Sequence, residues 1–389
     1  MSWKHVKIGD VCKMGAGGTP LKSKNEFYEG GTIPWLLSGE VSQGEIFASK
    51  QFITDEGLQN SSAKIFPKNT VLVAMYGATA GQVGILRFEA STNQAVCGIY
   101  PNDNFLPEFI YYSMLYKQKE LIGKATGNAQ PNISQIKVKS TDIPFIDKDE
   151  QKRIVAILDE AFAGIDTAIA NTEKNLANAR ELFESYLNSV FTQRGEGWEK
   201  KNLGDICENL DSKRIPITKS KRESGSIPYY GASGVVDYVA DYLFNENLLL
   251  VSEDGANLLA RTYPIAFSIS GKTWVNNHAH VLRFETMSSQ KFVEYYLNSI
   301  SLSHYISGMA QPKLNQKSLN SIKIPFPDED IKHNVVEKLD ELSVETKRLQ
   351  DSYKIKLSSL KELKQSLLQK AFSGELTSKP DKLIDEAVA

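Results

Sequence analysis

The sequence has few cysteines and no long apolar run. Its three cysteines lie far apart among 389 residues, so they form neither a metal-ligand cluster nor a disulfide framework. No stretch approaches the roughly 18 consecutive apolar residues that suggest a membrane-spanning helix, and the first residues contain no apolar signal core. These absences predict a cytoplasmic protein without a membrane-embedded segment.

The chain also lacks an excess of positive charge. Its 45 lysines and arginines are balanced by 47 aspartates and glutamates, which gives a formal net charge of −2. A protein that binds nucleic acid usually carries a basic domain. Any such binding by this chain therefore has to use local basic surface, or surface shared with partner subunits.

Motifs for nucleotide binding and methyl transfer are missing as well. The chain has no Gly-x-x-x-x-Gly-Lys-Ser/Thr loop and no Asn/Asp-Pro-Pro-Tyr/Phe tetrapeptide of amino-methyltransferases. The glycine-rich segments Gly15–Gly18 and Gly77–Gly81 do not match the Gly-x-Gly-x-x-Gly fingerprint of dinucleotide-binding folds. The sequence therefore predicts a chain that is not an enzyme and binds no cofactor of its own.

What the sequence does contain is an internal repeat. The segment Gly127–Ile133 returns as Gly308–Leu314, and matched residues keep the same offset of 181 as far as Phe191 and Phe372. Two copies are too few for a solenoid, which needs about three or more stacked units. The repeat instead predicts a duplicated unit with internal pseudo-twofold symmetry.

The front of each copy repeats with different offsets. Trp3 matches Trp198 at an offset of 195 residues, whereas Gly77 matches Gly255 at an offset of 178. Most of the length difference falls between Pro34 and Gly77. The N-terminal part of the two copies therefore differs in length, whereas the C-terminal part keeps a constant offset. This difference favours two different binding surfaces on one common scaffold.

Each copy has the pattern of a β-rich domain followed by a long helix. Strand-like runs bounded by Gly, Pro or Asn occur at 70–76, 82–88, 95–100, 248–251 and 280–284. Apolar residues at helical spacing predict further helices over 105–124 and 292–306. The predicted fold class is α+β, with two β-rich mixed domains.

Two stretches of roughly 40 residues have the pattern of coiled-coil helices. Their apolar residues recur every three or four positions, from Ile154 to Phe191 and from Val335 to Phe372. The first helix is expected to be capped by Asp147. A helix of this length with one apolar stripe is unstable alone in water, so the two are expected to pair. The globular domain between them favours an antiparallel coiled coil.

Two groups of polar residues suggest a catalytic or metal site. Asp328 and Glu329 resemble nuclease carboxylates, but acidic residues are also favoured at a helix start by the helix dipole. His278 and His280 could ligate a metal, yet no Cys, Asp or Glu lies at a matching spacing. The repeat aligns His278 with Gln94, an exchange that suits hydrogen bonding better than metal ligation. We therefore expect neither a metal site nor a nuclease site.

The order of these features resembles a known family. Duplicated β-rich domains and long helices, the Gly-x-Ala-Gln-Pro segments, the Ile324–Asp328 helix start and the Glu253–Asn257 segment are similar to the DNA-specificity subunit of type I restriction–modification systems. The resemblance covers essentially the whole chain, from Trp3 to Leu376. The parts that it implies are a first target-recognition domain, a spacer helix, a second target-recognition domain, a second spacer helix and a tail, at 1–146, 147–194, 195–327, 328–374 and 375–389.

The resemblance also implies a function and partners. In that family each globular domain recognises one half of a split DNA site, and the helices set the distance between the halves and bind methyltransferase subunits. The expected partners are double-stranded DNA, two methyltransferase (modification) subunits and ATP-dependent restriction subunits, without a membrane. S-adenosylmethionine is expected on the methyltransferase subunits and not on this chain.

Residues that contact DNA are expected on polar loops of both domains. Base edges are contacted by Arg, Lys, Asn and Gln together with Ser and Thr, and phosphates by Lys, Arg and exposed N–H groups, although the same residues also form ordinary turns. The candidates in the first domain are Lys22, Lys24, Ser38, Tyr76, Thr79, Asn93, Gln94 and Gln130. Those in the second are Lys213, Arg214, Lys219, Tyr230, Ser233, Asn257, Lys272, Asn277, His278, Gln311 and Lys313.

Two other classes of function stay open. A coiled-coil protein–protein scaffold without DNA binding would also need the long helices, and it predicts that the polar loops tolerate charge reversal. An enzyme with an unrecognised site is suggested by the carboxylates and histidines described above, and it predicts turnover by the isolated chain.

Overall fold

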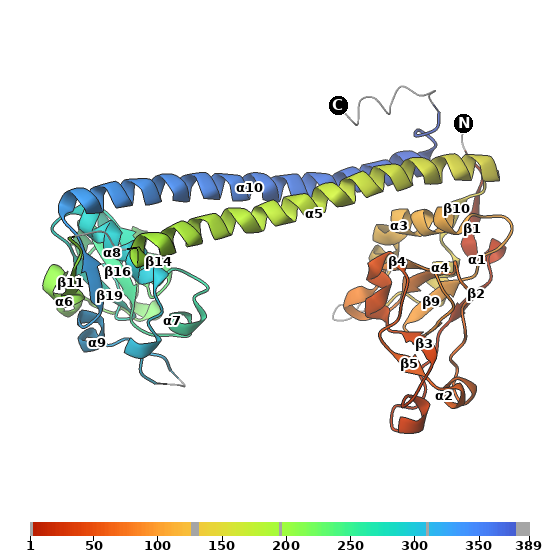
Figure 1. The fold of residues 1–389 in the computed structure, drawn as a ribbon, viewed down its shortest axis with the longest axis horizontal. Coiled ribbons are helices and arrows are strands. Elements are labelled where there is room, and N and C mark those ends of the chain that lie inside the picture. Colours follow the sequence, from red (N-terminus) through yellow and green to blue (C-terminus); the bar gives the residue numbers. More distant parts are fainter. Residues whose placement is uncertain (1–2, 126–131, 194–196, 309–310, 379–389) are drawn as a thin grey trace. The chain divides into compact units, whose positions relative to one another are not determined.

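The computed structural model describes residues 3–125, 132–193, 197–308 and 311–378 (Figure 1). The chain divides into two compact units, one of residues 1–172 with 356–389 and one of residues 173–355. Each unit holds one β-rich domain together with parts of two long helices, α5 (Lys148–Thr192) and α10 (Glu329–Ser373). The predicted α+β fold with duplicated β-rich domains and two long helices is confirmed.

The first domain contains a mixed sheet with the strand order β2-β9-β6-β7-β4 and a smaller sheet with the order β5-β3-β8. Successive side chains of a strand point to opposite faces. Val71 and Val73 therefore pack in the cluster that contains α3, whereas Leu72 and Ala74 pack in a second cluster on the other face. The strands are β1 (His5–Lys7), β2 (Met14–Ala16), β3 (Ile33–Leu36), β4 (Glu45–Ile46), β5 (Phe52–Ile53), β6 (Val71–Ala74), β7 (Val83–Leu86), β8 (Ser91–Thr92), β9 (Val96–Ile99) and β10 (Asp142–Pro144). The helices are α1 (Ile8–Val11), α2 (Asp55–Gln59), α3 (Pro107–Gly123) and α4 (Gln135–Lys139).

The second domain repeats this plan with sheets of order β12-β19-β16-β17 and β14-β13-β18-β15. Leu249 and Val251 of β16 pack in the cluster that contains α8, and Leu248 and Leu250 pack in the cluster on the other face. The strands are β11 (Glu199–Asn202), β12 (Glu208–Asn209), β13 (Ser224–Gly231), β14 (Gly234–Val239), β15 (Phe244–Asn245), β16 (Leu248–Ser252), β17 (Ala266–Ile269), β18 (Lys272–Val275), β19 (Ala279–Arg283) and β20 (Lys323–Phe326). The helices are α6 (Leu203–Ile206), α7 (Asn257–Ala260), α8 (Met287–Ser299) and α9 (Gln316–Asn320).

In each unit a strand pair joins the start and the end of the globular domain. β1 pairs antiparallel with β10, and β11 pairs antiparallel with β20. A long helix begins within a few residues after β10 and after β20. Both ends of each domain are therefore anchored next to the start of a long helix, and the polar loops are left for other contacts.

The two long helices run antiparallel where they meet in the first unit. Lys364 of α10 donates a hydrogen bond to Asp166 of α5, and Thr377, just beyond α10, donates to Glu150. The later residue, Thr377, thus contacts the earlier residue of α5, Glu150, as expected for antiparallel segments. The predicted cap is confirmed, because the carboxylate of Asp147 accepts hydrogen bonds from the N–H groups at the start of α5. Within the described part of the chain, no helix combines the length and apolar character needed to cross a membrane.

A tyrosine–aspartate hydrogen bond joins each globular domain to a long helix. Tyr112 of α3 donates to Asp159 of α5 (2.6 Å), and Tyr295 of α8 donates to Asp340 of α10. Burial, followed by the contact with the carboxylate, raises the pKa of both phenols well above the ordinary range. Both phenols therefore stay protonated over the ordinary pH range, and each pair attaches its domain to the helix in the same way.

One helix lies earlier in the sequence than predicted. α8 spans Met287–Ser299, whereas the apolar spacing predicted a helix over 292–306. Its start is set by Thr286, whose hydroxyl accepts a hydrogen bond from the N–H of Ser289 (3.1 Å). The prediction was wrong because it followed the apolar residues and gave no weight to this N-cap signal.

Candidate functional site

In the first domain, three of the predicted polar loops lie side by side. The N–H of Asn93 donates to the carbonyl of Leu36 (2.9 Å), and the N–H of Met75 donates to the carbonyl of Ala95 (2.7 Å). These contacts join the turns after β3, after β6 and before β9. They bring together the candidates Ser38, Tyr76, Thr79, Asn93 and Gln94.

The glycine-rich loop after β2 belongs to the same group. A Cβ on Gly17 would lie 2.2 Å from the hydroxyl oxygen of Thr92, so only glycine allows this close approach. The hydroxyl of Thr19 donates to the side chain of Gln94. Farther along this loop Lys22 and Lys24 are exposed. The candidate Gln130 lies outside the described residues.

The second domain gathers the corresponding loops. The N–H of Asn276 donates to the carbonyl of Tyr230 (3.0 Å), and the N–H of Gly255 donates to the carbonyl of Pro312 (3.1 Å). The loops brought together carry the candidates Lys213, Arg214, Tyr230, Ser233, Asn257, Asn277, His278, Gln311 and Lys313.

Two candidates of the second domain lie elsewhere. Lys219 is exposed in a short 3-10 helix, Lys219–Lys221. Lys272 begins β18 and so lies at the opposite end of that strand from the Asn276 turn, with its ammonium 4.8 Å from the ring centre of Tyr242. Neither is part of the loop group.

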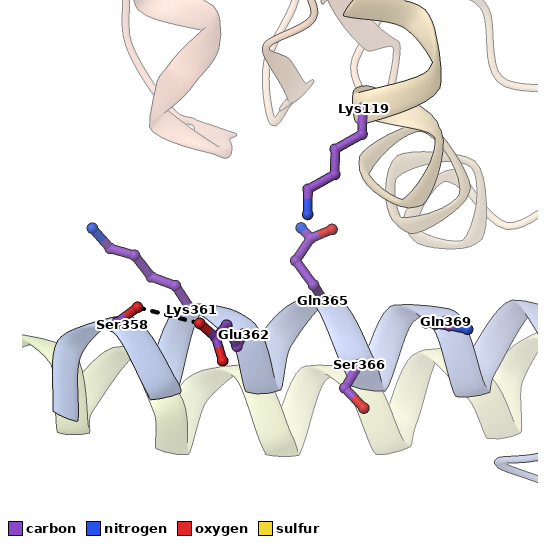
Figure 2. A pocket seen from close by; sticks show the side chains of 7 residues that line it. All are labelled: Lys119, Ser358, Lys361, Glu362, Gln365, Ser366 and Gln369. Carbon is purple, nitrogen blue, oxygen red and sulfur yellow. Dashed lines mark hydrogen bonds between the residues drawn. The ribbon is translucent and has the colours of Figure 1, made fainter. Parts of the chain in front are cut away.

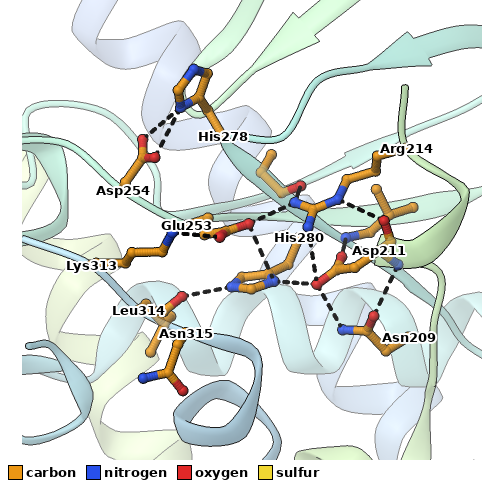
Figure 3. A network of polar contacts seen from close by, with 12 residues as sticks. Asn209, Asp211, Arg214, Glu253, Asp254, His278, His280, Lys313, Leu314 and Asn315 are labelled. Atoms are coloured by element: carbon orange, nitrogen blue, oxygen red, sulfur yellow. Dashed lines mark hydrogen bonds and ion pairs between the residues drawn. The ribbon is translucent and has the colours of Figure 1, made fainter. Parts of the chain in front are cut away.

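A buried network of charged residues lies beneath the second loop group (Figure 3). Arg214 is 2.7 Å from Glu253 and 3.6 Å from Asp211, and Lys313 is 3.2 Å from Glu253. His280 contacts Asp211 through Nδ1 (2.5 Å). The side chain of His280 is 1% exposed, and those of Asp211, Arg214 and Glu253 are 7%, 12% and 12% exposed.

No Cys, Asp or Glu lies at a matching sequence spacing from His280, but the structure gives this residue two acidic neighbours. Ligand atoms of Asp211, Glu253 and His280 all lie within 4.8 Å of one another. The partners come from strands and loops distant in sequence, so a search for regular spacing could not find them. Glu253 belongs to a segment that the resemblance singled out, but no pattern marked Asp211.

The arrangement fits an ion-pair network better than a metal site. Burial alone would raise the pKa of the Asp211 carboxyl, but hydrogen bonds from His280 and from the N–H of Val281, with the charge of Arg214, hold that pKa below its ordinary value. Asp211 is therefore ionised. His280 also faces the carbonyl oxygen of Leu314 through Nε2 (2.7 Å), so each ring nitrogen already has an oxygen partner within the protein.

The contacts also revise the alignment of the two copies. The side-chain oxygen of Asn93 accepts a hydrogen bond from the N–H of Ala95, and that of Asn276 accepts one from the N–H of His278. Asn93 therefore corresponds to Asn276, and His278 corresponds to Ala95. The predicted alignment of His278 with Gln94 was wrong by one residue.

The first unit has a polar hollow beside α10. This hollow of about 470 Å³ is lined by Lys119 of α3 and by α10 residues that include Glu362 and Ser366 (Figure 2). Its lining residues are all polar or charged, unlike the mainly hydrophobic and aromatic lining of small-molecule sites.

Comparison with a family model gives one clear match. Residues 1–178 and 195–358 match the type I restriction modification DNA specificity domain, once for each copy of the repeat. The matched segments cover most of the chain.

Individual relatives are similar over the whole chain or over part of it. The type I restriction enzyme MjaIX specificity subunit of Methanocaldococcus jannaschii is 26% identical over 422 residues, with 96% of this chain and 93% of that protein covered. The EcoR124I/EcoR124II specificity subunit of Escherichia coli is 27% identical over 197 residues, with 49% of this chain and 48% of that protein covered.

Solved structures share the fold. A chain from a study of complex assembly and conformational transition of the type I R-M system has a TM-score of 0.75 and 19% identity, with 96% of this chain and 98% of that chain covered. The HsdS subunit from Thermoanaerobacter tengcongensis has a TM-score of 0.58 and 19% identity, with 96% and 97% covered. At this identity the likeness concerns the fold alone.

Proposed function

The chain belongs to the type I restriction–modification DNA specificity family, and from this premise we propose that it recognises a DNA target in two halves, one with each β-rich domain. Recognition of a DNA target is the function of the family. The division into halves is supported by one observation above others. The two domains repeat the same central strand pairing and the same attachment to a helix, yet they differ in the loops gathered at one place.

The two loop groups are the proposed DNA-contacting surfaces. Asn93 and Gln94 in the first domain and Asn277 and His278 in the second stand at equivalent turns before β9 and β19. Such side chains can pair with base edges in the major groove. The exposed lysines Lys22, Lys24 and Lys213 of these loop groups provide the phosphate contacts. Arg214 is engaged inside the protein, so we assign it to holding the loops.

We propose that the long helices bind two methyltransferase subunits. Glu181 and Ser185 of α5 are repeated as Glu362 and Ser366 of α10, and all four side chains are exposed. Exposed helix positions do not pack in the core, so packing does not require the same residue in both copies. The repeated residues therefore support one shared docking role at two equivalent places. S-adenosylmethionine then binds to the methyltransferase subunits, and ATP-dependent restriction subunits join this complex.

We expect the chain alone to transfer no methyl group and to support transfer only in complex with methyltransferase subunits. The measurement is transfer of labelled methyl groups from S-adenosylmethionine to host DNA that lacks the modification, together with the mass of the complex. Methyl transfer by the pure chain would contradict the assignment, and a complex with one methyltransferase per chain would contradict the two docking places.

Paired variants test the docking surface. The double variant Glu181→Lys with Glu362→Lys is expected to lose methyltransferase subunits from the complex. Glu173→Lys is the matched control, because Glu173 is exposed on α5 but corresponds to a lysine, Lys354, in the other copy. If the control weakens the complex as much as the double variant does, the repeated residues have no special role.

A further inference from the structure

The buried charges of the second domain have no counterpart among the described residues of the first domain. Met14 of β2 lies opposite Ile99 of β9, and Asn209 of β12 lies opposite Leu282 of β19. Two residues after Met14 and two residues before Ile99, the first domain has Ala16 opposite Cys97. At the equivalent positions, two residues after Asn209 and two residues before Leu282, the second domain has Asp211 beside His280. The strand framework is the same and the side chains differ completely in polarity.

Glu253 also replaces an apolar residue. The N–H of Leu314 donates to the carbonyl of Glu253 (2.8 Å), as the N–H of Ile133 donates to the carbonyl of Met75 (2.8 Å). Met75 is buried in the apolar core of the first domain. Ala16 and Asp211 are 195 residues apart in the sequence, and the same offset relates Thr19 to Arg214. The four least exposed members of the cluster, Asp211, Arg214, Glu253 and His280, thus stand where the first domain has small or apolar side chains.

The fold itself therefore does not call for this network. Burial of charged groups costs desolvation free energy, and apolar residues of similar volume are often as stabilising or more so. The first domain shows that the same sheet forms with Ala16, Met75 and Cys97 at these positions. The network is specific to the second domain, so its role is expected in the loops of that domain.

We infer that this network positions the DNA-contacting loops of the second domain, an inference that rests on the proposed function. Arg214 joins its own loop to Glu253 and to the carbonyl of Ala279 (2.7 Å), next to His278. His280 and Lys313 join these loops to the segment around Leu314. Four loops are thereby held as one rigid group.

Loss of the network is expected to affect recognition of only one half of the target. Bidentate contacts to base edges depend on the fixed geometry of the side chains that make them, and a preorganised surface loses less conformational entropy on binding. Phosphate contacts by exposed lysines need less exact positioning and carry no sequence information. Loss of the network should therefore reduce discrimination in the second half-site while non-specific binding and the first half-site stay unchanged.

The test exchanges the network for the residues of the first domain. The variant carries Asp211→Ala, Arg214→Thr, Glu253→Met and His280→Cys together, so that no buried charge loses its partner. The full chain, purified with its methyltransferase subunits, is equilibrated with a randomised DNA duplex library, and the bound fraction is sequenced. Discrimination in the second half-site is expected to fall about ten- to a hundredfold, as for the loss of one good base contact.

A second charge cluster on the same strand provides the matched control. Arg283 of β19 forms ion pairs with Glu208 and Glu246, at the end of the strand away from the loops. The triple variant Glu208→Gln, Glu246→Gln and Arg283→Gln removes two acidic charges and one basic charge, as does the loss of Asp211, Glu253 and Arg214, and is expected to leave both half-sites unchanged.

Each outcome decides the matter. If the wild-type complex shows no preference in one of the two halves, the proposed function fails and not the inference. If the wild type reads both halves and the folded network variant reads them equally well, the inference is overturned. A network variant that does not fold, judged by thermal unfolding beside the wild type, overturns it as well, because the charges would then be needed for the fold itself.

Discussion

Exchange of residues 13–140 for those of a relative with a different target is expected to replace one half of the recognised sequence and to leave the other half unchanged. The segment holds every candidate loop of the first domain that the structure describes, but it excludes β1 and β10. The strand pair that anchors the domain beside α5 is therefore kept. The measurement is the methylated motif in a host that carries the exchanged gene.

The expected effect of this exchange is large. Each mismatched base pair costs about 1–3 kcal/mol, and specific sites are bound roughly 10³–10⁷ times more tightly than non-specific DNA. A half-site that differs at three base pairs should therefore lose essentially all methylation. The reciprocal exchange of residues 208–321 is the control and should change only the other half. A change of both halves after either exchange would refute the modular account.

Lengthening both long helices is expected to shift the spacing between the half-sites without changing either of them. Insertion of four residues after Thr172 and four after Ile355 falls at the junctions between the compact units, so contacts within each unit are kept. Four helical residues add about 6 Å, and B-DNA rises about 3.4 Å per base pair. The non-specific spacer should lengthen by one or two base pairs, and methylation at the original spacing should fall to background.

The same four residues inserted after Ser378, beyond the end of α10, provide the control. This variant should keep the original spacing, since neither helix is lengthened. A helix-insertion variant that stays folded and still methylates at the original spacing would show that the helices hold partner subunits and do not set the distance.

Strong periodicity made the helices and central strands predictable from the sequence. The apolar stripes of α5 and α10 and the cap at Asp147 were identified because helical spacing persists for many turns. Buried strands such as β6 and β16 were found because continuous apolar runs are bounded by turn residues. The hairpin of β13 and β14 was not predicted, because the segment around Tyr230 shows mainly its turn residues and its strands are largely exposed.

The candidate site was predictable only in part. Loops with Gly, Asn and Lys could be selected by residue type, and the structure brings most of them together within each domain. The partners of His280 could not be predicted, because Asp211 lies 69 residues away and reaches it through pairing of distant strands. Residue type also assigned Arg214 to DNA, whereas its guanidinium is occupied by Glu253 and by a backbone carbonyl.

The central claim, recognition of a DNA target in two halves, is tested most directly by sequencing DNA methylation across the genome of a host with and without this gene. The methyltransferase gene is present in both strains, so the difference reports this chain alone. The account predicts one methylated motif that depends on the gene and consists of two specific segments separated by a fixed number of unspecified bases. A continuous motif, or methylation that is the same in both strains, would contradict it.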